Sequence, residues 1–413
     1  MSKRRVVITG IGVVSPIGND LATFWNGILE GRNGVGLISQ FDPEGFRTRF
    51  AMEVKDFDPS SRVDRKTTRL LDKFSLYALY AAGEAVEDSG LDPSKAPDRY
   101  GVITGSGIGG ILEMEQQANI LRERGPSRVS PFFIPKMIIN AAAGQIAIAH
   151  GFKGMNFATV SACASSQHAL GIALDMIRAD RCDAILAGGS EASVTPVSIA
   201  GFCALKAMST RNDEYQTAMR PFQASRDGFV MGEGGCMFMF EELEHARKRG
   251  AEIYCEVLGF GATDDAFHMT APDPEAAMAQ EAMRLALVDG GCNTDEVNYI
   301  NAHGTSTPLN DVMEQHAVRK LLGANSEKVM MSSTKSQVGH LLGASGAVEL
   351  AAVAVGIKEG VVPATINQID PDPQCPLDTV PNEAREAQIE VALSNSFGFG
   401  GHDACLCVGR FKG

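Results

Sequence analysis

One pattern recurs along the chain: a short apolar run rich in β-branched residues leads through glycine or other small residues into a helical pattern. In the first half, such runs lie at residues 5–9, 100–104, 156–160 and 184–187. In the second half, they lie at residues 253–259, 297–301, 328–332 and 390–394. Strands that alternate with helices in this way predict an α/β fold. No linker separates the halves, so we expect two similar α/β halves packed face to face, over residues 1–250 and 251–413.

The junction within residues 156–170 is the most informative of these. Cys163 stands where the predicted strand turns sharply into a helix. A thiol at this place lies near unpaired backbone N–H groups and the positive end of the helix dipole. Such surroundings lower the pKa of a thiol and raise its thiolate fraction, so Cys163 is a candidate nucleophile. A small buried cysteine that only packs a tight turn is the alternative.

Composition narrows the class of protein. With 413 residues, 44% of them apolar, the chain can bury a large core in two or three folding units or one intertwined unit. A net charge of −13 argues against a nucleic-acid binder, which needs a basic face. It leaves room for a local basic patch that binds an acidic partner.

The nine cysteines are scattered and show no C-x-x-C spacing. This usage predicts reduced thiols in the cytoplasm rather than disulfides, and it argues against a structural zinc site. The first ten residues pass straight into a strand without an apolar signal region, and no apolar run is long enough to cross a bilayer. We therefore expect a soluble cytoplasmic protein with no metal and no membrane contact.

Residues 105–110, Gly-Ser-Gly-Ile-Gly-Gly, match the G-x-G-x-x-G pattern of a dinucleotide site after a strand. The context of such a site is missing, because the next helix leads into a proline-containing segment at 126–131 rather than a second strand ending in an acid. Close backbone packing at a strand-to-helix turn explains these glycines better.

Four predicted strand ends carry side chains that could take part in catalysis. They are Cys163, His303, Lys335 with His340, and Phe399 in a glycine-rich loop. A lone histidine is more often structural, and Lys335 alone could be an exposed charge. Their common setting at strand ends matters more, because ligands bind at that edge of open α/β sheets. A cysteine with two histidines predicts nucleophilic acyl chemistry, in which imidazoles donate to a developing oxyanion.

Four motifs in this order carry a resemblance to a known family. They are Thr159-Val160-Ser161-Ala162-Cys163-Ala164-Ser165, Asn301-Ala302-His303-Gly304-Thr305-Ser306-Thr307, Lys335-Ser336-Gln337-Val338-Gly339-His340 and Asn395-Ser396-Phe397-Gly398-Phe399-Gly400-Gly401. The chain resembles the β-ketoacyl-[acyl-carrier-protein] synthases from end to end, above all the elongating type II enzymes of bacterial fatty-acid synthesis. The resemblance implies a thiolase-like fold, with two duplicated βαβαβαββ halves in a five-layer α-β-α-β-α arrangement, and a homodimer.

The resemblance also implies a decarboxylating Claisen condensation. Cys163 would take the acyl chain from acyl carrier protein as a thioester. His303 and His340 would bind malonyl-acyl carrier protein, promote loss of carbon dioxide and stabilise the enolate. The carbanion would attack the acyl-Cys163 carbonyl and give a 3-oxoacyl-acyl carrier protein two carbons longer. No cofactor is required.

Further roles follow from the same resemblance. The backbone N–H groups of Cys163 and Phe399 would form an oxyanion hole, and Phe399 would act as an aromatic gate. Lys335 would fix the His340 loop and pair with Glu349. The acyl tunnel and substrate pocket would be lined by Ile108, Phe202, Thr305, Thr307 and Gly400. Candidate contacts for the acidic carrier protein are Arg65, Lys66, Arg69 and Lys206, although pattern alone makes the first three a solvated helix start.

The chain departs from the family pattern in two places. Asp403 follows His402 where the family has asparagine, and Gly234-Gly235-Cys236 differs from the usual Gly-Ala-Gly. Two other functions stay open: a ketosynthase of a polyketide or specialised acyl pathway, and a non-catalytic chain-length partner subunit. The intact cysteine and histidines argue against the partner subunit. Thiolase-like degradation needs a second cysteine, and none stands at a suitable place.

Overall fold

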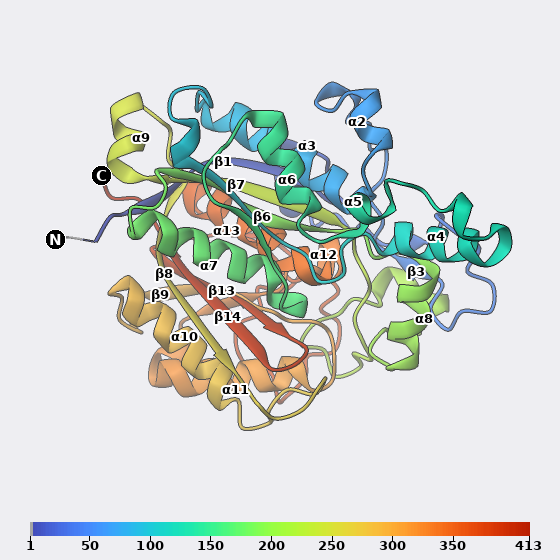
Figure 1. Cartoon of the computed structure of the whole chain (residues 1–413). Helices are drawn as coiled ribbons and strands as arrows, with labels where there is room; N and C mark the ends of the chain where they lie inside the picture. The colour runs from blue at the N-terminus through green and yellow to red at the C-terminus, as the bar shows by residue number, and fades with distance from the viewer. Residues whose placement is uncertain (1–2) are drawn as a thin grey trace.

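The computed structural model describes residues 3–413 and shows a mixed α/β molecule (Figure 1). Ten strands form one sheet in the order β10-β9-β13-β14-β8-β1-β7-β6-β4-β5. The first half contributes β1 (Val6–Val14), β4 (Tyr100–Gly105), β5 (Asn156–Thr159), β6 (Ala184–Glu191) and β7 (Gly234–Glu242). The second half contributes β8 (Cys255–Asp264), β9 (Val297–Asn301), β10 (Met330–Ser332), β13 (Val391–Gly398) and β14 (His402–Gly409).

The two halves repeat one topology. In each, the strands follow the spatial order first, fifth, fourth, second, third. The second strand pairs parallel with the third and fourth, and the fifth pairs antiparallel with the fourth and first. The strands of the two halves pair where Val6–Ile8 of β1 lies beside Cys255–Val257 of β8. This topology confirms the predicted duplication.

Helices build three layers around the two sheet halves (Figure 1). On one outer side, α3 (Lys73–Ser89) covers β1 and β7, and α6 (Ala141–His150) packs beside it. On the other, α10 (Ala277–Gly290) covers β8 and β14, and α11 (Asn310–Leu322) packs against α10. Between the sheet halves, α7 (Ser165–Arg178) and α13 (Ser345–Glu359) pack against each other and contact both. The five layers are therefore α-β-α-β-α, as predicted.

Shorter elements complete the chain. The remaining helices are α1 (Leu21–Leu29), α2 (Arg65–Arg69), α4 (Ile111–Arg124), α5 (Phe133–Met137), α8 (Pro196–Ala204), α9 (Leu243–Arg249) and α12 (Lys335–Val338). Two small ribbons pair β2 (Gly36–Leu37) with β3 (Phe50–Ala51) and β11 (Val361–Val362) with β12 (Arg385–Glu386). Among the described residues, no helix combines the length and the hydropathy needed to cross a membrane.

The first strand corrects an expectation. The sequence predicts a strand over residues 5–9 and a loop at Gly10-Ile11-Gly12, but β1 continues through both glycines to Val14. A Cβ atom at Gly10 would lie 2.2 Å from the carbonyl oxygen of Ala85, and one at Gly12 would lie 2.0 Å from that of Ala81. The glycines therefore let α3 lie directly on the strand.

The second half contains the same arrangement of two glycines under an outer helix. A Cβ atom at Gly259 in β8 would lie 2.2 Å from the carbonyl oxygen of Ala286, and one at Gly261 would lie 2.0 Å from that of Ala282. In both halves, the outer helix thus crosses the first strand over a Gly-x-Gly pair.

The glycines at 105–110 also have a structural explanation. Gly105 ends β4 at the start of α7, where a Cβ atom would lie 2.4 Å from the backbone nitrogen of Ser166. The N–H of Gly107 donates to the buried carboxylate of Glu191. Close packing therefore accounts for this motif, as the sequence analysis preferred.

Candidate active site

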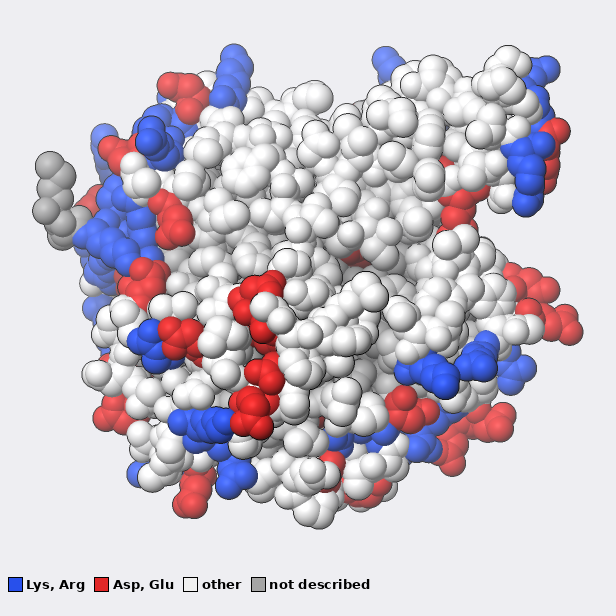
Figure 2. Space-filling model, turned by 60° about the horizontal axis from the view of Figure 1, so that its bottom comes forward, with Lys and Arg blue, Asp and Glu red and all other residues white. Residues whose placement is uncertain are grey.

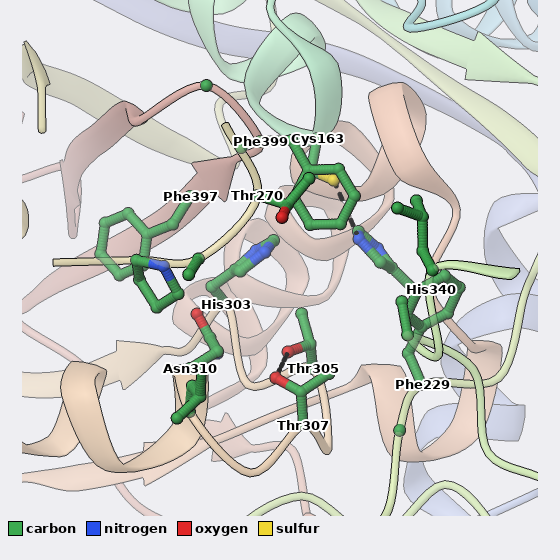
Figure 3. A pocket seen from close by; sticks show the side chains of 18 of the residues that line it. Cys163, Phe229, Thr270, His303, Thr305, Thr307, Asn310, His340, Phe397 and Phe399 are labelled. Carbon is green, nitrogen blue, oxygen red and sulfur yellow. Dashed lines mark hydrogen bonds between the residues drawn. The ribbon is translucent and has the colours of Figure 1, made fainter. Parts of the chain in front are cut away.

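Cys163, His303 and His340 converge on one cavity of about 340 Å³ (Figure 3). The cysteine sulfur and one ring nitrogen of each histidine all lie within 4.8 Å of one another. Sγ of Cys163 is 3.1 Å from Nε2 of His340, and the two imidazole rings are nearly perpendicular, with centroids 5.4 Å apart. All three side chains are buried. A small molecule at this point could contact the sulfur and both rings together.

Cys163 stands in a short 3-10 turn, Ala162–Ala164, between β5 and α7. The turn begins with Ala162 in the left-handed region at φ 48°, which is uncommon for a residue with a Cβ atom. An equivalent turn, Leu342–Ala344, precedes α13 in the second half, with Leu342 at φ 47°. The duplicated fold thus makes the same sharp entry into both central helices.

The glycine-rich loop after β13 approaches the sulfur closely. A Cβ atom at Gly398 would lie 2.8 Å from the carbonyl oxygen of Ser161 and 3.2 Å from the backbone nitrogen of Cys163. The backbone N–H of Phe399 lies beside the Cys163 sulfur and favours its thiolate form. Two backbone N–H groups, those of Cys163 and Phe399, are therefore adjacent to the reactive atom.

The thiol of Cys163 behaves differently from the sequence prediction. Burial raises its pKa to about 12, although Lys335 and the N–H of Phe399 both favour the thiolate. The prediction of a lowered pKa was wrong because the loss of water around the sulfur outweighs the helix terminus and the nearby charge. At neutral pH the resting form is a thiol in contact with the imidazole of His340.

His303 has a defined tautomer. Its Nδ1 lies 3.4 Å from Nζ of Lys335, and an ammonium group can only donate. Nδ1 therefore accepts, and the proton resides on Nε2, which faces the cavity. Lys335 itself is fully buried and forms a salt bridge with the buried carboxylate of Glu349.

A buried carboxylate also holds the His303 loop. The backbone N–H groups of His303 and Gly304 each donate to Glu314 at 2.8 Å. The side-chain amide of Asn395 donates to the same carboxylate at 3.1 Å. Burial raises the pKa of Glu314 to about 7. Glu314 lies on α11, and nothing in the sequence motifs pointed to it.

His340 is fixed by the segment before β7. Its backbone N–H donates to the carbonyl of Val230, and its own carbonyl accepts from Gly232. Its Nδ1 lies 2.9 Å from Oγ of Ser345, and the ring of Phe229 packs edge-on against it at 5.1 Å. The glycine-rich residues around 227–235 thus form the support of this histidine.

Both imidazoles are neutral. Burial, aided by the positive charge of Lys335, holds the pKa of His303 and His340 well below 6.5. With Nδ1 of each ring occupied by Lys335 or Ser345, Nε2 is the atom presented to the cavity. The site can therefore offer two imidazole N–H donors to an oxygen bound between them.

Most of the predicted substrate residues line the same cavity. Phe202, Thr305, Thr307, Phe399 and Gly400 all face it, and the hydroxyl groups of the two threonines are 2.9 Å apart (Figure 3). Several lining residues carried no signal in the sequence because they lie outside the four motifs, in loops or at the start of α11. They are Asp265, Thr270, Ala271, Pro272, Leu309 and Asn310.

Ile108 lies elsewhere. It packs against the apolar cluster that includes Cys163, but it lines a second, apolar cavity with Met114, Met137 and Ile139. Its backbone N–H and that of Gly107 donate to Glu191. Ile108 thus separates the cysteine from this second cavity.

The four basic residues do not form one patch on a single chain. Lys206 lines the cavity just after α8, whereas Arg65, Lys66 and Arg69 are exposed on α2. In Figure 1, α2 lies at the upper right, well apart from α8 below it. Only Lys206 therefore lies at the cavity within one copy.

Comparison with known proteins agrees with this geometry. Residues 3–246 match the model of the β-ketoacyl synthase N-terminal domain, and residues 254–368 match that of its C-terminal domain. The chain is 49% identical over 412 residues to a 3-oxoacyl-[acyl-carrier-protein] synthase 2 of Coxiella burnetii, covering 99% of both chains. It is 48% identical over 413 residues to the Synechocystis protein of that name, covering 100% of this chain and 99% of that one.

Solved structures give the same picture. A β-ketoacyl synthase from Burkholderia phymatum superposes with a TM-score of 0.92 at 37% identity, covering 99% of this chain and all of that one. A type II polyketide ketosynthase in complex with its acyl carrier protein superposes with a TM-score of 0.92 at 35% identity, covering 100% of both chains. The chain therefore belongs to the β-ketoacyl synthase family, a class of condensing enzymes with the duplicated fold described above. Its curated relatives are, in particular, 3-oxoacyl-[acyl-carrier-protein] synthases of type 2.

Proposed function

We propose that this chain is an elongating β-ketoacyl-[acyl-carrier-protein] synthase. It condenses an acyl group held on Cys163 with malonyl-acyl carrier protein and yields 3-oxoacyl-acyl carrier protein, carbon dioxide and free acyl carrier protein. The observation that carries the proposal is the convergence of one sulfur and two neutral imidazoles in one buried cavity. The names of relatives at 47–49% identity over the full length support the substrate class.

The first half-reaction loads the enzyme. Sγ of Cys163 attacks the thioester carbonyl of the acyl carrier protein, and the developing oxyanion accepts from the N–H groups of Cys163 and Phe399. The carbon–sulfur bond to the carrier breaks, and the proton of the cysteine thiol ends on the departing carrier thiol. Because Oγ of Ser345 can either accept from or donate to Nδ1, His340 can carry its proton on Nδ1 in this step. Its unprotonated Nε2, 3.1 Å from Sγ, is then placed to relay the thiol proton.

The second half-reaction forms the carbon–carbon bond. The thioester oxygen of malonyl-acyl carrier protein accepts from Nε2–H of His303 and His340, and the bond to the carboxylate breaks to give carbon dioxide and an enolate. The enolate carbon attacks the acyl carbonyl on Cys163, and the carbon–sulfur bond to the enzyme then breaks. The released thiolate takes up one proton from solvent, which restores the thiol. Decarboxylation supplies the carbanion without removal of a proton from carbon, so donors to the enolate oxygen suffice.

Lys335 and Glu349 act as positioning residues in this scheme. The ammonium group fixes the His303 tautomer, and the carboxylate keeps the ammonium group in place. Phe399, whose ring lies 6.4 Å from that of Phe202, serves as the gate between the thiol and the malonyl pocket. Ile108 and Phe202 line the path of the acyl chain, and Thr305, Thr307 and Gly400 contact the malonyl substrate.

The working form is a homodimer. The outer edge of β10 is covered by a bridge with Asp378, whereas β5 finds no partner for its outer edge within residues 3–413. Uncovered edges of this kind favour pairing with a second chain. Large apolar side chains near β5 are exposed, among them Ile148 (76%) and Val160 (57%). Figure 2 shows few charged side chains over the upper and central part of the face that it presents.

Acyl carrier protein docks at the mouth of the cavity beside Lys206. A second copy of the chain is needed to bring an α2 with Arg65, Lys66 and Arg69 toward the same acidic partner, because one copy holds them apart from Lys206. The location is the cytoplasm, where free thiols persist; all nine cysteines are unpaired.

A polyketide ketosynthase is the second candidate, since one solved neighbour, at 35% identity, is such an enzyme. The higher identity to 3-oxoacyl-[acyl-carrier-protein] synthases favours fatty-acid elongation. The purified protein should be incubated with malonyl-acyl carrier protein and acyl carrier proteins of graded chain length. A 3-oxoacyl product two carbons longer supports the proposal, and absence of product with every chain length refutes it. Sedimentation should show a dimer that Ile148→Glu weakens; a monomeric wild type refutes the homodimer.

A further inference from the structure

Two carboxyl groups meet behind the glycine-rich loop. Asp403, the second residue of β14, is only 3% exposed, and its carboxyl group lies within hydrogen-bonding reach of that of Asp265, which follows directly after β8. One oxygen of the Asp403 carboxyl group, Oδ2, is buried, and no N–H or O–H group of the described residues donates to it. A hydrogen bond between two carboxyl groups requires that one of them carries a proton.

The pair lies between two loops that line the active-site cavity. One is the glycine-rich loop with Phe399, Gly400 and Gly401, and the other is the segment 265–273. The N–H of Asp265 donates to the carbonyl of Gly401, and the N–H of Gly400 donates to the carbonyl of Met269, both at 2.9 Å. The carboxyl pair therefore adds a side-chain contact to two backbone contacts between the same loops.

The surroundings of the pair are acidic. Asp264 lies beside it at the end of β8, with His402 at 3.5 Å from that carboxylate, and the carboxylate of Glu314 on α11 also acts on Asp403. Asp273 faces Asp265 from the far end of its own loop, and α10 presents Glu281 and Arg284, which pair with each other. Within residues 3–413, no lysine or arginine forms an ion pair with Asp265 or Asp403.

The energetic consequence is direct. Burial and the neighbouring carboxylates raise the pKa of Asp403 to about 9 and also raise that of Asp265. The pair holds one proton at neutral pH, because two adjacent buried carboxylates without a cation repel each other strongly.

We propose that Asp265 and Asp403 form a proton-linked latch that holds the Phe399 loop against segment 265–273 and releases it when the shared proton is lost. The consequence for catalysis rests on the proposed gate role of Phe399. With the proton in place, the loops are joined and the N–H of Phe399 stays at the Cys163 sulfur. Without it, two carboxylates face each other, and the loops separate.

An asparagine at position 403 provides the sharpest test. Its amide can donate to the Asp265 carboxylate, so Asp403→Asn keeps the hydrogen bond but has no proton to lose. Asp265→Asn is the matched variant from the opposite loop. Both side chains are nearly the size of the ones they replace, and neither replaces a residue that touches the reacting atoms.

Amide hydrogen exchange of the glycine-rich loop and of segment 265–273 should be compared in wild type and both variants from about pH 6.5 to about pH 9.5. Dividing the wild-type exchange rate by the rate of each variant at the same pH removes the intrinsic pH dependence of amide exchange. We expect wild-type exchange in both loops to rise at least about fivefold relative to Asp403→Asn as pH passes the pKa of the pair. Amide exchange within α13 serves as an internal reference, and its ratio between wild type and variant should not change with pH.

If the ratio of wild-type to Asp403→Asn exchange rates stays constant over this pH range, the latch proposal is wrong. It is also wrong if the exchange rates of α13 change with pH as much as those of the two loops. Should Asp403→Asn fail to fold, Asp265→Asn gives the same comparison. The rate at which a bulky maleimide alkylates Cys163 provides a second readout that needs no carrier protein. Loop release at high pH without faster alkylation would keep the latch and refute the gate role of Phe399, so the two failures are distinguishable.

Discussion

Sγ of Cys163 lies 3.1 Å from Nε2 of His340, although the two residues are 177 positions apart in the chain. The cysteine enters a central helix of the first half, and the histidine precedes a central helix of the second. Because α7 and α13 pack against each other, the contact exists only when both halves are folded and docked. The site is therefore a property of the complete fold rather than of either half.

Cys163→Ala should abolish condensation, by at least about 1,000-fold, because it removes the nucleophile. It should leave decarboxylation of malonyl-acyl carrier protein measurable, since both imidazoles remain. Intact-protein mass spectrometry should show no acyl adduct, while release of carbon dioxide continues. Normal condensation by this variant would refute the assignment of the nucleophile.

His303→Ala and His340→Ala should each slow decarboxylation by about 100- to 1,000-fold, because each removes one donor to the enolate oxygen. Acylation of Cys163 should still be detectable by mass spectrometry in both variants. Loss of acylation together with decarboxylation would show that the histidines are needed for the thiol chemistry itself.

Lys335→Met should raise the pKa of His303 and, to a smaller extent, that of His340, because the nearby positive charge that depresses both is gone. It should also destabilise the protein by about 3–5 kcal/mol, since Glu349 is left buried without its partner. Histidine NMR titration measures the first effect. The double variant Lys335→Met/Glu349→Gln should regain stability but keep the raised pKa values; an unchanged His303 pKa would contradict this account.

Charge reversal at Lys66 and Arg69 should raise KM for carrier-protein substrates about tenfold and leave KM for pantetheine mimics nearly unchanged, because only the protein carrier is acidic. Reversal at Arg247 and Lys248 on α9, an exposed basic helix at the other side of the molecule, is the matched control (Figure 1). Equal effects on both substrate types, or an equal effect of the control, would remove the docking proposal.

Asp403→Asn should stabilise the protein at mildly alkaline pH. The pKa of Asp403 rises from 3.8 to about 9 on folding, so the native state binds more protons than the unfolded chain between these values. Stability of the wild type therefore falls as pH rises through this window. The variant should exceed the wild type by at least about 1 kcal/mol near pH 8, and the difference should shrink toward pH 4. Denaturant titrations across this range measure it; a pH-independent difference would contradict the linkage.

The sequence predicted the architecture because its signals are local. Strands that end in small residues and lead into helices fix an α/β chain, and their repetition in both halves is confirmed by the strand order. The predicted length of β1 was wrong, because two glycines close together are typical of a loop, whereas here Gly10 and Gly12 allow α3 to pack on the strand. No local pattern contains the contact of a strand with a helix some seventy residues further on.

Some residues of the site could be predicted from sequence motifs, whereas others are identified only by their contacts in the fold. Cys163, His303 and His340 stand in motifs, and their meeting follows from the topology of strand ends. Glu314, which holds two N–H groups of the His303 loop, belongs to an ordinary helix and became visible only by its contacts. The raised pKa of Cys163 could not be predicted either, because burial depends on the whole packed cavity. The departure at Asp403, in contrast, was visible in the sequence, but its partner Asp265 was not.

The paired entries into α7 and α13 have one more consequence. Gly343 occupies the place in the second turn that Cys163 occupies in the first, and a Cβ atom there would lie 2.2 Å from the backbone nitrogen of Gly107 and 2.7 Å from the Glu191 carboxylate. No reactive side chain can therefore stand at the mirrored position. The duplicated fold therefore contains two equivalent turns, and crowding leaves room for a nucleophilic side chain only in the first, while the second half contributes the two imidazoles.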